Sequence, residues 1–307
     1  MQRFCQMVYY LCTNNGKKTT IMVNTEELFG TKNPWEEVAD MYNWQEKDCL
    51  FSKKACYVCE GDKKEIDEFN EKLEKTLKGK DKKAQQEILK DKIVTNIPAE
   101  PWWGNPLTAR LIILSLNPGY VPEVNEKLAK LLQSNDTVRE QLISFKAKTL
   151  RLEADSFLPP DDNLCKPVSC KDAVNMLGDW YWYRMLKRVR TEVGIDEDEF
   201  FKKIALIEYH GYSSETSNRT FPLRKQYLKS QEFIRELIHY VAQKDNVRFL
   251  IMRSAEKWKE LLNSNDSHFF ENNITKFLCK TNKGMSQAIT QNNLGDIYRE
   301  ITNLLRK

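Results

Sequence analysis

The stretch ARLIILSLNPGY, residues 109–120, decides the fold because a short apolar run ends abruptly in a polar turn. The run is rich in Leu and Ile and does not alternate with polar residues, which is typical of a parallel strand covered on both faces. Pro118 keeps Asn117 out of the helical region, and Gly119 allows a tight turn. Ligands of open α/β sheets bind beyond the carboxyl ends of the strands. The sequence therefore predicts a buried strand that leads directly into a candidate site.

Further apolar runs, each ending in a small polar turn, occupy residues 203–209, 247–252 and 274–279. Helical patterns are interspersed with them at residues 123–133, 178–194, 230–242, 256–262 and 293–305. Strands that alternate with helices indicate right-handed crossovers and parallel pairing. We therefore predict an α/β domain over residues 96–307, with three layers and a mainly parallel four-stranded sheet.

Residues 1–95 are predicted to form a separate, helical N-terminal region. Asn33 followed by Pro34 indicates a helix start, with Asn33 as the cap. Residues 60–92 combine apolar residues at helical spacing with balanced charges, which predicts a charged helical arm broken near Gly79. Charges that recur at i and i+4 usually form a solvated helix face.

The composition is that of an ordinary globular protein. The chain has 307 residues, of which 41% are hydrophobic and 30% charged. No apolar run is long enough to span a bilayer, and residues 1–5 lack the apolar core of a signal peptide. We therefore expect a cytoplasmic protein with no membrane partner. The net charge of +4 arises wholly after residue 95, which favours an anionic partner for the second part of the chain.

Cysteines at positions 49, 56 and 59 raise the question of a metal site. Cys56 and Cys59 form one C-x-x-C pair, but a closed zinc site needs a fourth ligand, and no histidine occurs before His210. Buried or loop thiols are the alternative explanation for Cys49 and its two neighbours. The adjacent aspartates at residues 161–162 are typical of a Pro-rich turn. We expect neither a metal nor a cofactor.

The turn after the first strand resembles a known motif. Residues 116–119, LNPG, are similar to the G-[IM]-N-P-G motif of the uracil-DNA glycosylase superfamily, in its mismatch-specific and single-strand-selective branches. In that superfamily the fourth strand precedes a motif of the N-P-S-G-L-S or H-P-S-P-L-S type, and residues 281–286, TNKGMS, align with it without a gap. The resemblance covers about residues 100–307.

The resemblance implies a role for particular residues. Asn117 would orient a water for attack on the sugar carbon of a flipped nucleotide, and Tyr120 would stack on the base. Met285 would fill the gap that the flipped nucleotide leaves. The residues expected to hold the nucleic-acid backbone are Ser213, Ser214, Lys280, Lys283 and Ser286.

This sequence departs from the superfamily pattern where the departing base is normally stabilised. Thr281 stands where His or Asn is common, so the usual donor is missing, and Ser115 replaces the first Gly of the first motif. His210 is the candidate substitute as a catalytic donor; the alternative is a histidine satisfied within a turn. Tyr209 and Asn282, which flank His210 and Thr281, complete the expected base pocket.

Basic residues outside these turns offer a second surface for phosphate. On the helix predicted at residues 178–194, Arg184, Lys187 and Arg188 share one face, opposite an apolar face. Arg224 lies in the basic loop of residues 219–226. Both segments can equally be solvated surface. Trp102 and Trp103, just before the first strand, can stack on a base or cover the edge of the sheet.

Three functions remain open at this point. The chain is a glycosylase-like hydrolase that acts on a base in DNA, or a module of the same fold that binds a nucleic acid or nucleotide without cleaving it. The third possibility is an α/β domain whose arm at residues 60–92 contacts another protein, whose nature the sequence does not indicate.

Overall fold

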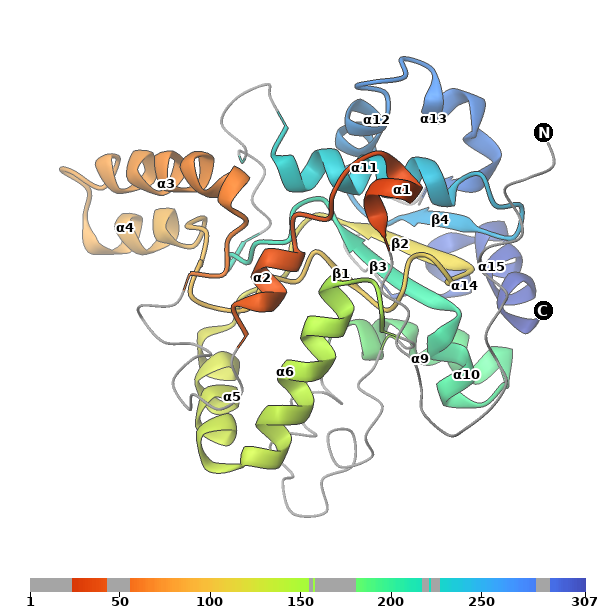
Figure 1. The fold of residues 1–307 in the computed structure, drawn as a ribbon, viewed down its shortest axis with the longest axis horizontal. Helices are drawn as coiled ribbons and strands as arrows, with labels where there is room; N and C mark the ends of the chain where they lie inside the picture. Colours follow the sequence, from red (N-terminus) through yellow and green to blue (C-terminus); the bar gives the residue numbers. More distant parts are fainter. Residues whose placement is uncertain are drawn as a thin grey trace.

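A five-stranded mixed sheet forms the centre of the protein (Figure 1). The structure, a computed structural model, describes residues 24–42, 56–154, 157, 181–216, 221, 227–279 and 288–307. The sheet has the order β1-β3-β2-β4-β5. Its strands are β1 (Trp102–Trp103), β2 (Leu111–Ser115), β3 (Ile204–Glu208), β4 (Arg248–Ile251) and β5 (Phe277–Cys279).

The four predicted strands are present and pair in parallel, but the prediction of a four-stranded sheet is wrong at one edge. Trp102 and Trp103 form a fifth strand, which runs antiparallel to β3 and makes the sheet mixed. Gly104 ends this strand with a φ of +70°, and a Cβ at that position would lie 2.5 Å from the carbonyl oxygen of Ile204. The two tryptophans thus cover the edge of the sheet, which was one of the two roles considered for them.

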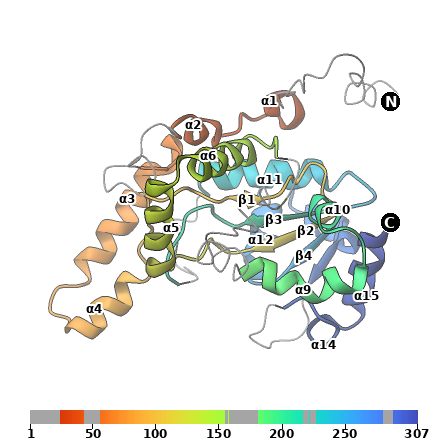
Figure 2. The same ribbon diagram turned by 90° about the horizontal axis from the view of Figure 1, so that it is seen from below.

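Side chains of successive strand residues enter two separate cores, so the sheet is covered on both faces. In β2, Ile112 and Leu114 belong to one core, whereas Leu111 and Ile113 belong to the other. Figure 2 shows α6 and α11 on one side of the sheet and α9 and α15 on the other. This is the three-layer arrangement that uninterrupted apolar strands require.

The helices follow the predicted order with several additions. Those before β3 are α1 (Thr25–Phe29), α2 (Glu36–Asp40), α3 (Glu60–Lys75), α4 (Lys82–Leu89), α5 (Pro122–Ser134), α6 (Asp136–Leu150), α9 (Tyr181–Val193) and α10 (Glu197–Lys202). Those after β3 are α11 (Lys229–Val241), α12 (Ala255–Leu262), α13 (Phe269–Asn272), the 3-10 turn η1 (Ile274–Lys276), α14 (Gln291–Leu294) and α15 (Asp296–Arg306).

Two predicted helix boundaries are wrong. Helix α2 begins at Glu36, later than predicted, and its N-cap position is Trp35 rather than Asn33. Asn33 still supports the turn that leads into the helix, because its Oδ1 accepts a hydrogen bond from the backbone nitrogen of Trp35, while its Nδ2 donates to the carbonyl of Leu150. The C-terminal helix is interrupted at Gly295, whose φ of 57° separates α14 from α15. The charged arm is a hairpin of α3 and α4, as predicted, and Gly79 lies in its turn with a φ of 76°.

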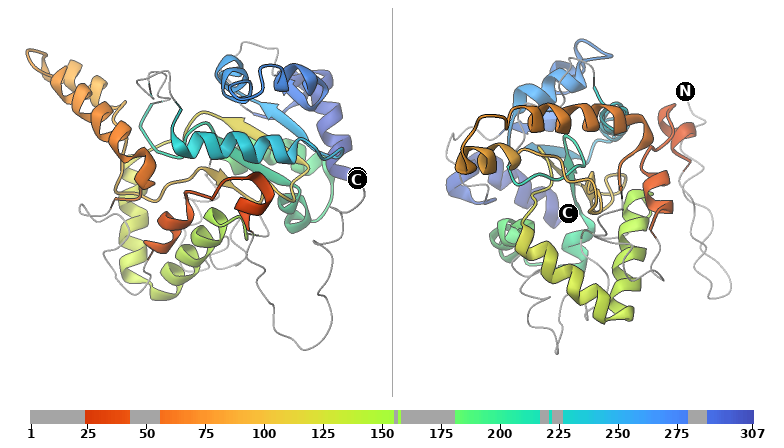
Figure 3. Two further views of the ribbon diagram at one scale, coloured as in Figure 1. Left: turned by 45° about the horizontal axis from the view of Figure 1, so that its top comes forward. Right: turned by 90° about the vertical axis from the view of Figure 1, so that its left-hand side faces the viewer.

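The described part of the N-terminal region packs into the core on the α11 face of the sheet. Trp35, Ile66 and Phe69 are almost completely buried there together with strand residues. Beyond this contact, α3 and α4 project away from the sheet (Figure 3). The base of the arm is therefore fixed while its tip lies in solvent.

A buried carboxylate secures the base of the arm. Asp62 of α3 has no exposed surface; its Oδ2 accepts a hydrogen bond of 2.6 Å from the Tyr212 hydroxyl, and its Oδ1 accepts one of 3.3 Å from the backbone nitrogen of Ser230. Ser230 lies in the first turn of α11, where backbone N–H groups favour a negative charge. Asp62 therefore ties α3 to α11 and to the segment that follows β3.

The Asp62–Tyr212 contact predicts a measurable loss of stability. Tyr212→Phe leaves one oxygen of a buried carboxylate without its donor, so we expect the free energy of unfolding to fall by about 1–3 kcal/mol in urea denaturation. Tyr183→Phe is the matched control, because the Tyr183 hydroxyl contacts Glu197 at the surface. Equal, small effects of the two substitutions would contradict the assigned role of Asp62.

Candidate functional site

The turns that follow β2 and β3 lie side by side at the carboxyl edge of the sheet. Backbone pairing continues past the strands: the nitrogen of Tyr209 donates to the carbonyl of Ser115 at 3.1 Å, and the nitrogen of Tyr120 donates to that of Ser214 at 3.0 Å. Gly119 and Ser214 also form an isolated parallel bridge. The segments 117–120 and 209–214, which are far apart in sequence, therefore form one rim.

Asn117 is held at this rim by its amide nitrogen. Its Nδ2 donates to the Ser214 hydroxyl at 3.1 Å and to the carbonyls of Pro118 and Thr216 at 3.1 and 3.4 Å. The Ser214 hydroxyl donates in turn to the Thr216 carbonyl at 2.7 Å. Carbonyl oxygens only accept hydrogen bonds, so this environment fixes which end of the amide is the nitrogen. Among the described residues nothing donates to Oδ1, which leaves a half-buried, oriented acceptor.

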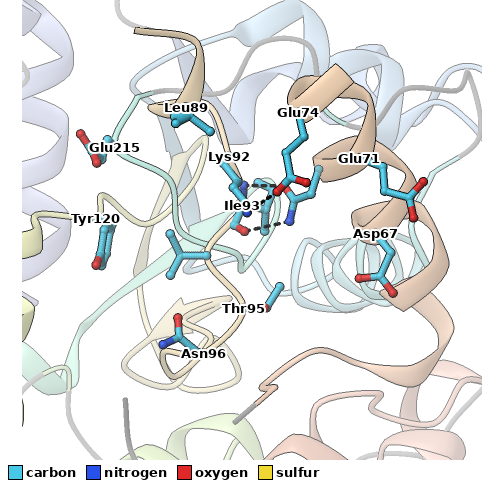
Figure 4. Close-up of a pocket in the computed structure, with 12 residues that line it drawn as sticks. Asp67, Glu71, Glu74, Leu89, Lys92, Ile93, Thr95, Asn96, Tyr120 and Glu215 are labelled. Carbon is cyan, nitrogen blue, oxygen red and sulfur yellow. Dashed lines mark hydrogen bonds and ion pairs between the residues drawn. The ribbon is translucent and has the colours of Figure 1, made fainter. Parts of the chain in front are cut away.

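Tyr120 borders a pocket between the turn and the arm (Figure 4). The pocket has a volume of about 590 Å³. Tyr120 and Glu215 stand on one side of it, and the carboxylates of α3 stand on the other, with Glu74 paired to Lys92 at 2.6 Å. A half-buried aromatic ring at this position can stack on a planar ligand. The acidic α3 wall disfavours an anionic group on that side.

His210 is not placed to supply a proton. It is 1% exposed, neither ring nitrogen has a hydrogen-bond partner among the described residues, and its ring packs edge-on against Phe221 at 5.2 Å. Desolvation, with a smaller contribution from Lys257, lowers the pKa of His210 to about 3. The imidazole is therefore neutral at physiological pH and enclosed by protein.

The neighbours of His210 are also buried. Tyr209 is 4% exposed and packs edge-on against Trp258, whose indole nitrogen donates to the Ser115 carbonyl at 3.1 Å. Ser213 and Ser214 are buried as well, and the Ser214 hydroxyl is engaged with Asn117. Ser214 thus positions the amide and offers no surface to a phosphate in this structure.

The predicted basic face of α9 is exposed. Arg184, Lys187 and Arg188 all lie in solvent on the face of the sheet opposite to α3. Arg190 differs, because its guanidinium lies over the Tyr183 ring at 4.1 Å and pairs with Glu197 at 3.3 Å. Three neighbouring cations are therefore available to an anionic partner.

Several predicted residues lie outside the described residues. They are the terminal motif and its flanks, Lys280, Thr281, Asn282, Lys283, Met285 and Ser286, together with Arg224, Cys49 and the aspartates at residues 161–162. Whether the fourth turn meets Asn117 therefore stays a prediction.

Two of the three clustered cysteines are described. Cys59 is buried, and desolvation, followed by the charge of Asp62, raises its pKa well above the ordinary thiol value. Cys56 is half-buried. Within the described ranges no group of three or more potential metal ligands occurs.

Glu208 is a candidate that the motif search missed. It is the last residue of β3 and pairs with Ser115 in the sheet register. It is 3% exposed, and its Oε2 has no hydrogen-bond partner within the described part of the chain. Desolvation is the main cause that raises its pKa to about 8; the nearby Glu100 raises it further, while the Ser115 hydroxyl and Arg253 oppose the shift. The only sequence signal was an acidic residue that ends an apolar run.

Comparison with known proteins adds no assignment. The chain matches no family model, and neither a curated protein nor a solved structure is significantly similar to it. In the part of the chain that the structure describes, no helix has the length and apolar character needed to cross a membrane.

The buried Glu208 carboxyl predicts a pH-dependent stability. A carboxyl whose pKa is raised by folding stays protonated in the folded protein when the unfolded chain has already lost its proton. The free energy of unfolding should therefore fall as the pH rises from about 5 to about 8. Glu208→Gln does not ionise, so its free energy of unfolding should change less over this pH range. Because one pKa unit corresponds to about 1.4 kcal/mol, the difference from wild type should be on the order of a few kcal/mol. Parallel profiles from urea denaturation would contradict the assignment.

Proposed function

We propose that the chain hydrolyses the N-glycosidic bond of a nucleotide flipped out of DNA, as its resemblance to the uracil-DNA glycosylase superfamily implies. The observation that carries the proposal is the geometry of Asn117. Three acceptors hold its amide nitrogen, and none of the described residues donates to its carbonyl oxygen at the rim where β2 and β3 end.

The chemistry requires little activation of the nucleophile. A glycosidic bond breaks through an oxocarbenium-like state, which a well-placed water can capture. The Asn117 Oδ1 would accept a hydrogen bond from this water and aim its oxygen at C1′. The bonding electrons leave with the base, the water oxygen bonds to C1′, one water proton passes to solvent, and the base gains a proton.

Other features support the same proposal. Tyr120 follows Asn117 closely and borders a pocket large enough for a planar base. The parallel strands have the spatial order second, first, third and fourth, which brings the second turn beside Asn117. Binding at the carboxyl edge of such a sheet is the common arrangement in α/β proteins.

A second candidate function is binding of a nucleic acid without cleavage. His210, the substitute donor expected from the sequence, is enclosed, with its pKa lowered by burial. The exposed cations on α9 would still attract a phosphate backbone. The two functions predict different effects of substituting Asn117. Cleavage requires this residue, whereas binding without cleavage does not.

Substitution of Asn117 tests the first function. Single-stranded and duplex oligonucleotides that carry uracil or another altered base are incubated with the protein, and abasic sites are detected by alkaline strand cleavage. Because Asn117→Ala removes the acceptor that orients the water, we expect the rate to fall by about 100-fold or more.

Asn125→Ala is the matched control, since among the described residues the Asn125 amide nitrogen donates only to the Val121 carbonyl, in an exposed hydrogen bond. It should retain the wild-type rate. Ser214→Ala should give a smaller loss than Asn117→Ala, because two carbonyls still hold the amide. No abasic product, or equal product from wild type and Asn117→Ala, would reject the proposal.

Charge removal on α9 tests for a phosphate-binding surface. The triple variant Arg184→Gln, Lys187→Gln and Arg188→Gln should bind a fluorescent oligonucleotide more weakly, and its affinity should depend less steeply on salt. Each lost phosphate contact reduces the salt slope by about 0.7–0.9.

The control variant removes three exposed cations from the arm: Lys78→Gln, Lys80→Gln and Lys82→Gln. It changes net charge equally but should leave the salt slope unaltered. If both triple variants weaken binding to the same extent, the effect is one of net charge and α9 is not the contact surface.

A further inference from the structure

The pocket beside Tyr120 is lined by carboxylates from two parts of the chain (Figure 4). Asp67, Glu71 and Glu74 come from α3, and Glu215 comes from the turn that follows β3. Figure 4 shows Glu215 and the Tyr120 ring on one side of the pocket and the α3 carboxylates on the other. A bound group would therefore meet an aromatic ring on one side and negative charge on both.

The lysines near the pocket are paired with other side chains. The Lys92 Nζ lies 2.6 Å from Glu74, and the Lys90 Nζ lies 2.6 Å from Glu87. Glu215 is exposed and forms no ion pair with another described residue. Lys92 is the only cation among the described residues that line the pocket, so its charge does not offset the carboxylates around it.

The Tyr120 hydroxyl experiences the same negative charge. Desolvation is the main cause that raises its pKa, and the charges of Glu215, Glu126 and Glu123 raise it further. Glu123 and Glu126 belong to α5, so carboxylates of a further element also act on this ring. The face of an aromatic ring attracts cations, and nearby carboxylates add to that attraction. The pocket therefore favours a planar group with a positive charge.

The rim that carries Asn117 also forms one wall of this pocket. The Asn117 amide nitrogen donates to the Ser214 hydroxyl and to the Thr216 carbonyl, and these two residues flank Glu215. The Tyr120 nitrogen donates to the Ser214 carbonyl. The ring, the Glu215 carboxylate and the amide proposed to orient a water therefore belong to one hydrogen-bonded unit.

The donor that the sequence predicts for a departing base is not available at the end of β3. His210 is enclosed by protein, and burial keeps it neutral by lowering its pKa to about 3. A base that departs as an anion needs a donor where its negative charge develops. A base that is positively charged before its bond breaks departs as a neutral molecule, so it needs no such donor.

We propose that this pocket accepts a base with a permanent positive charge, a purine alkylated at a ring nitrogen, and that such bases in DNA are the substrates of the protein. The inference rests on the glycosylase function proposed above and names its substrate class. Tyr120 stacks on the purine, while Glu215 and the α3 carboxylates balance its charge.

The cleavage of such a base balances without a proton donor. Alkylation at N7 leaves the guanine ring with a positive charge. When the N9–C1′ bond breaks, its electron pair passes to the ring and cancels this charge, so 7-alkylguanine leaves as a neutral molecule. The water oriented by Asn117 bonds to C1′ and releases a proton to solvent. Because the positive charge moves from the base to the sugar, the carboxylates around the base contribute to binding and not to the chemical step.

A DNA duplex that carries 7-methylguanine tests the inference at mildly acidic pH, where the alkylated base keeps its charge. Base release above the spontaneous rate is measured, with a uracil-containing duplex as the reference. Wild type should have a lower KM for the methylated duplex. The double variant Glu74→Gln and Glu215→Gln removes two carboxylates and frees Lys92, so this KM should rise by about fivefold or more without a fall in kcat. The KM for the uracil duplex should not change.

The double variant Glu140→Gln and Glu300→Gln is the matched control. Glu140 is exposed, Glu300 pairs with Arg248 at 2.9 Å, and neither lines the pocket. This variant changes the net charge equally and should leave both KM values unaltered. Equal increases of KM in the two double variants would overturn the role of the pocket.

The outcomes separate this inference from the proposed function. If wild type releases uracil or another uncharged base but not methylguanine, the substrate class is overturned and the glycosylase function stands. If it releases no base from any duplex, the glycosylase function fails and the inference fails with it. Thermal melting confirms that each variant is folded, which the exposure of the substituted side chains favours.

Discussion

The continued pairing of β2 and β3 beyond their strand ends is the constraint on which the candidate site depends. Parallel strands bring their carboxyl ends to one edge, but they do not by themselves hold the turns together. Here the Tyr120 nitrogen bonds the Ser214 carbonyl, and the Ser214 hydroxyl accepts from the Asn117 amide. A backbone hydrogen bond and a side-chain hydrogen bond thus both join the turn after β2 to the turn after β3. An amide that several acceptors restrain loses little further freedom when it binds a water, which is what positioning requires.

The end of β3 carries two buried ionisable side chains on which burial has opposite effects. Glu208 and His210 are both buried, and both carry atoms without a partner among the described residues. Leaving a buried polar group unsatisfied costs about 1–3 kcal/mol, so a stable fold tolerates few of them. Burial acts on the two groups in opposite directions, because it disfavours the charged form of each: it keeps the proton on Glu208 and removes it from His210.

The parts of the fold that follow a local period were predictable from the sequence, and the parts that depend on tertiary contacts were not. Uninterrupted apolar runs predicted the four parallel strands, and the polar turn predicted the place of Asn117. Strand β1 was not predicted, because a strand of two residues is too short to show a period. Helix α6 was not predicted, because its buried face includes Arg139 and Lys146, and charged residues are normally expected to face solvent.

In the candidate site, too, the features that depend on tertiary contacts could not be predicted from the sequence. Asn117 was recognisable from its turn, but its restraint by Ser214 joins residues 97 positions apart. The burial of His210 depends on packing against Phe221, which no spacing reveals. Glu208 was hidden for a different reason: a single acid at the end of an apolar run is usually the first solvent-exposed residue of a turn, and only the sheet register shows that it stays inside.

The two sides of the sheet carry opposite charges near the proposed site. Near Tyr120 the wall formed by α3 carries carboxylates, whereas the exposed cations of α9 lie on the other face of the sheet. A polyanion that approached along α3 would meet like charge, and one that approached along α9 would meet opposite charge. The buried Asp62 keeps the base of α3 against α11, so the acidic wall is a fixed part of the surface. Under the proposed function, the arm would therefore direct a nucleic-acid backbone to the α9 side and leave the pocket beside Tyr120 to a planar group without negative charge.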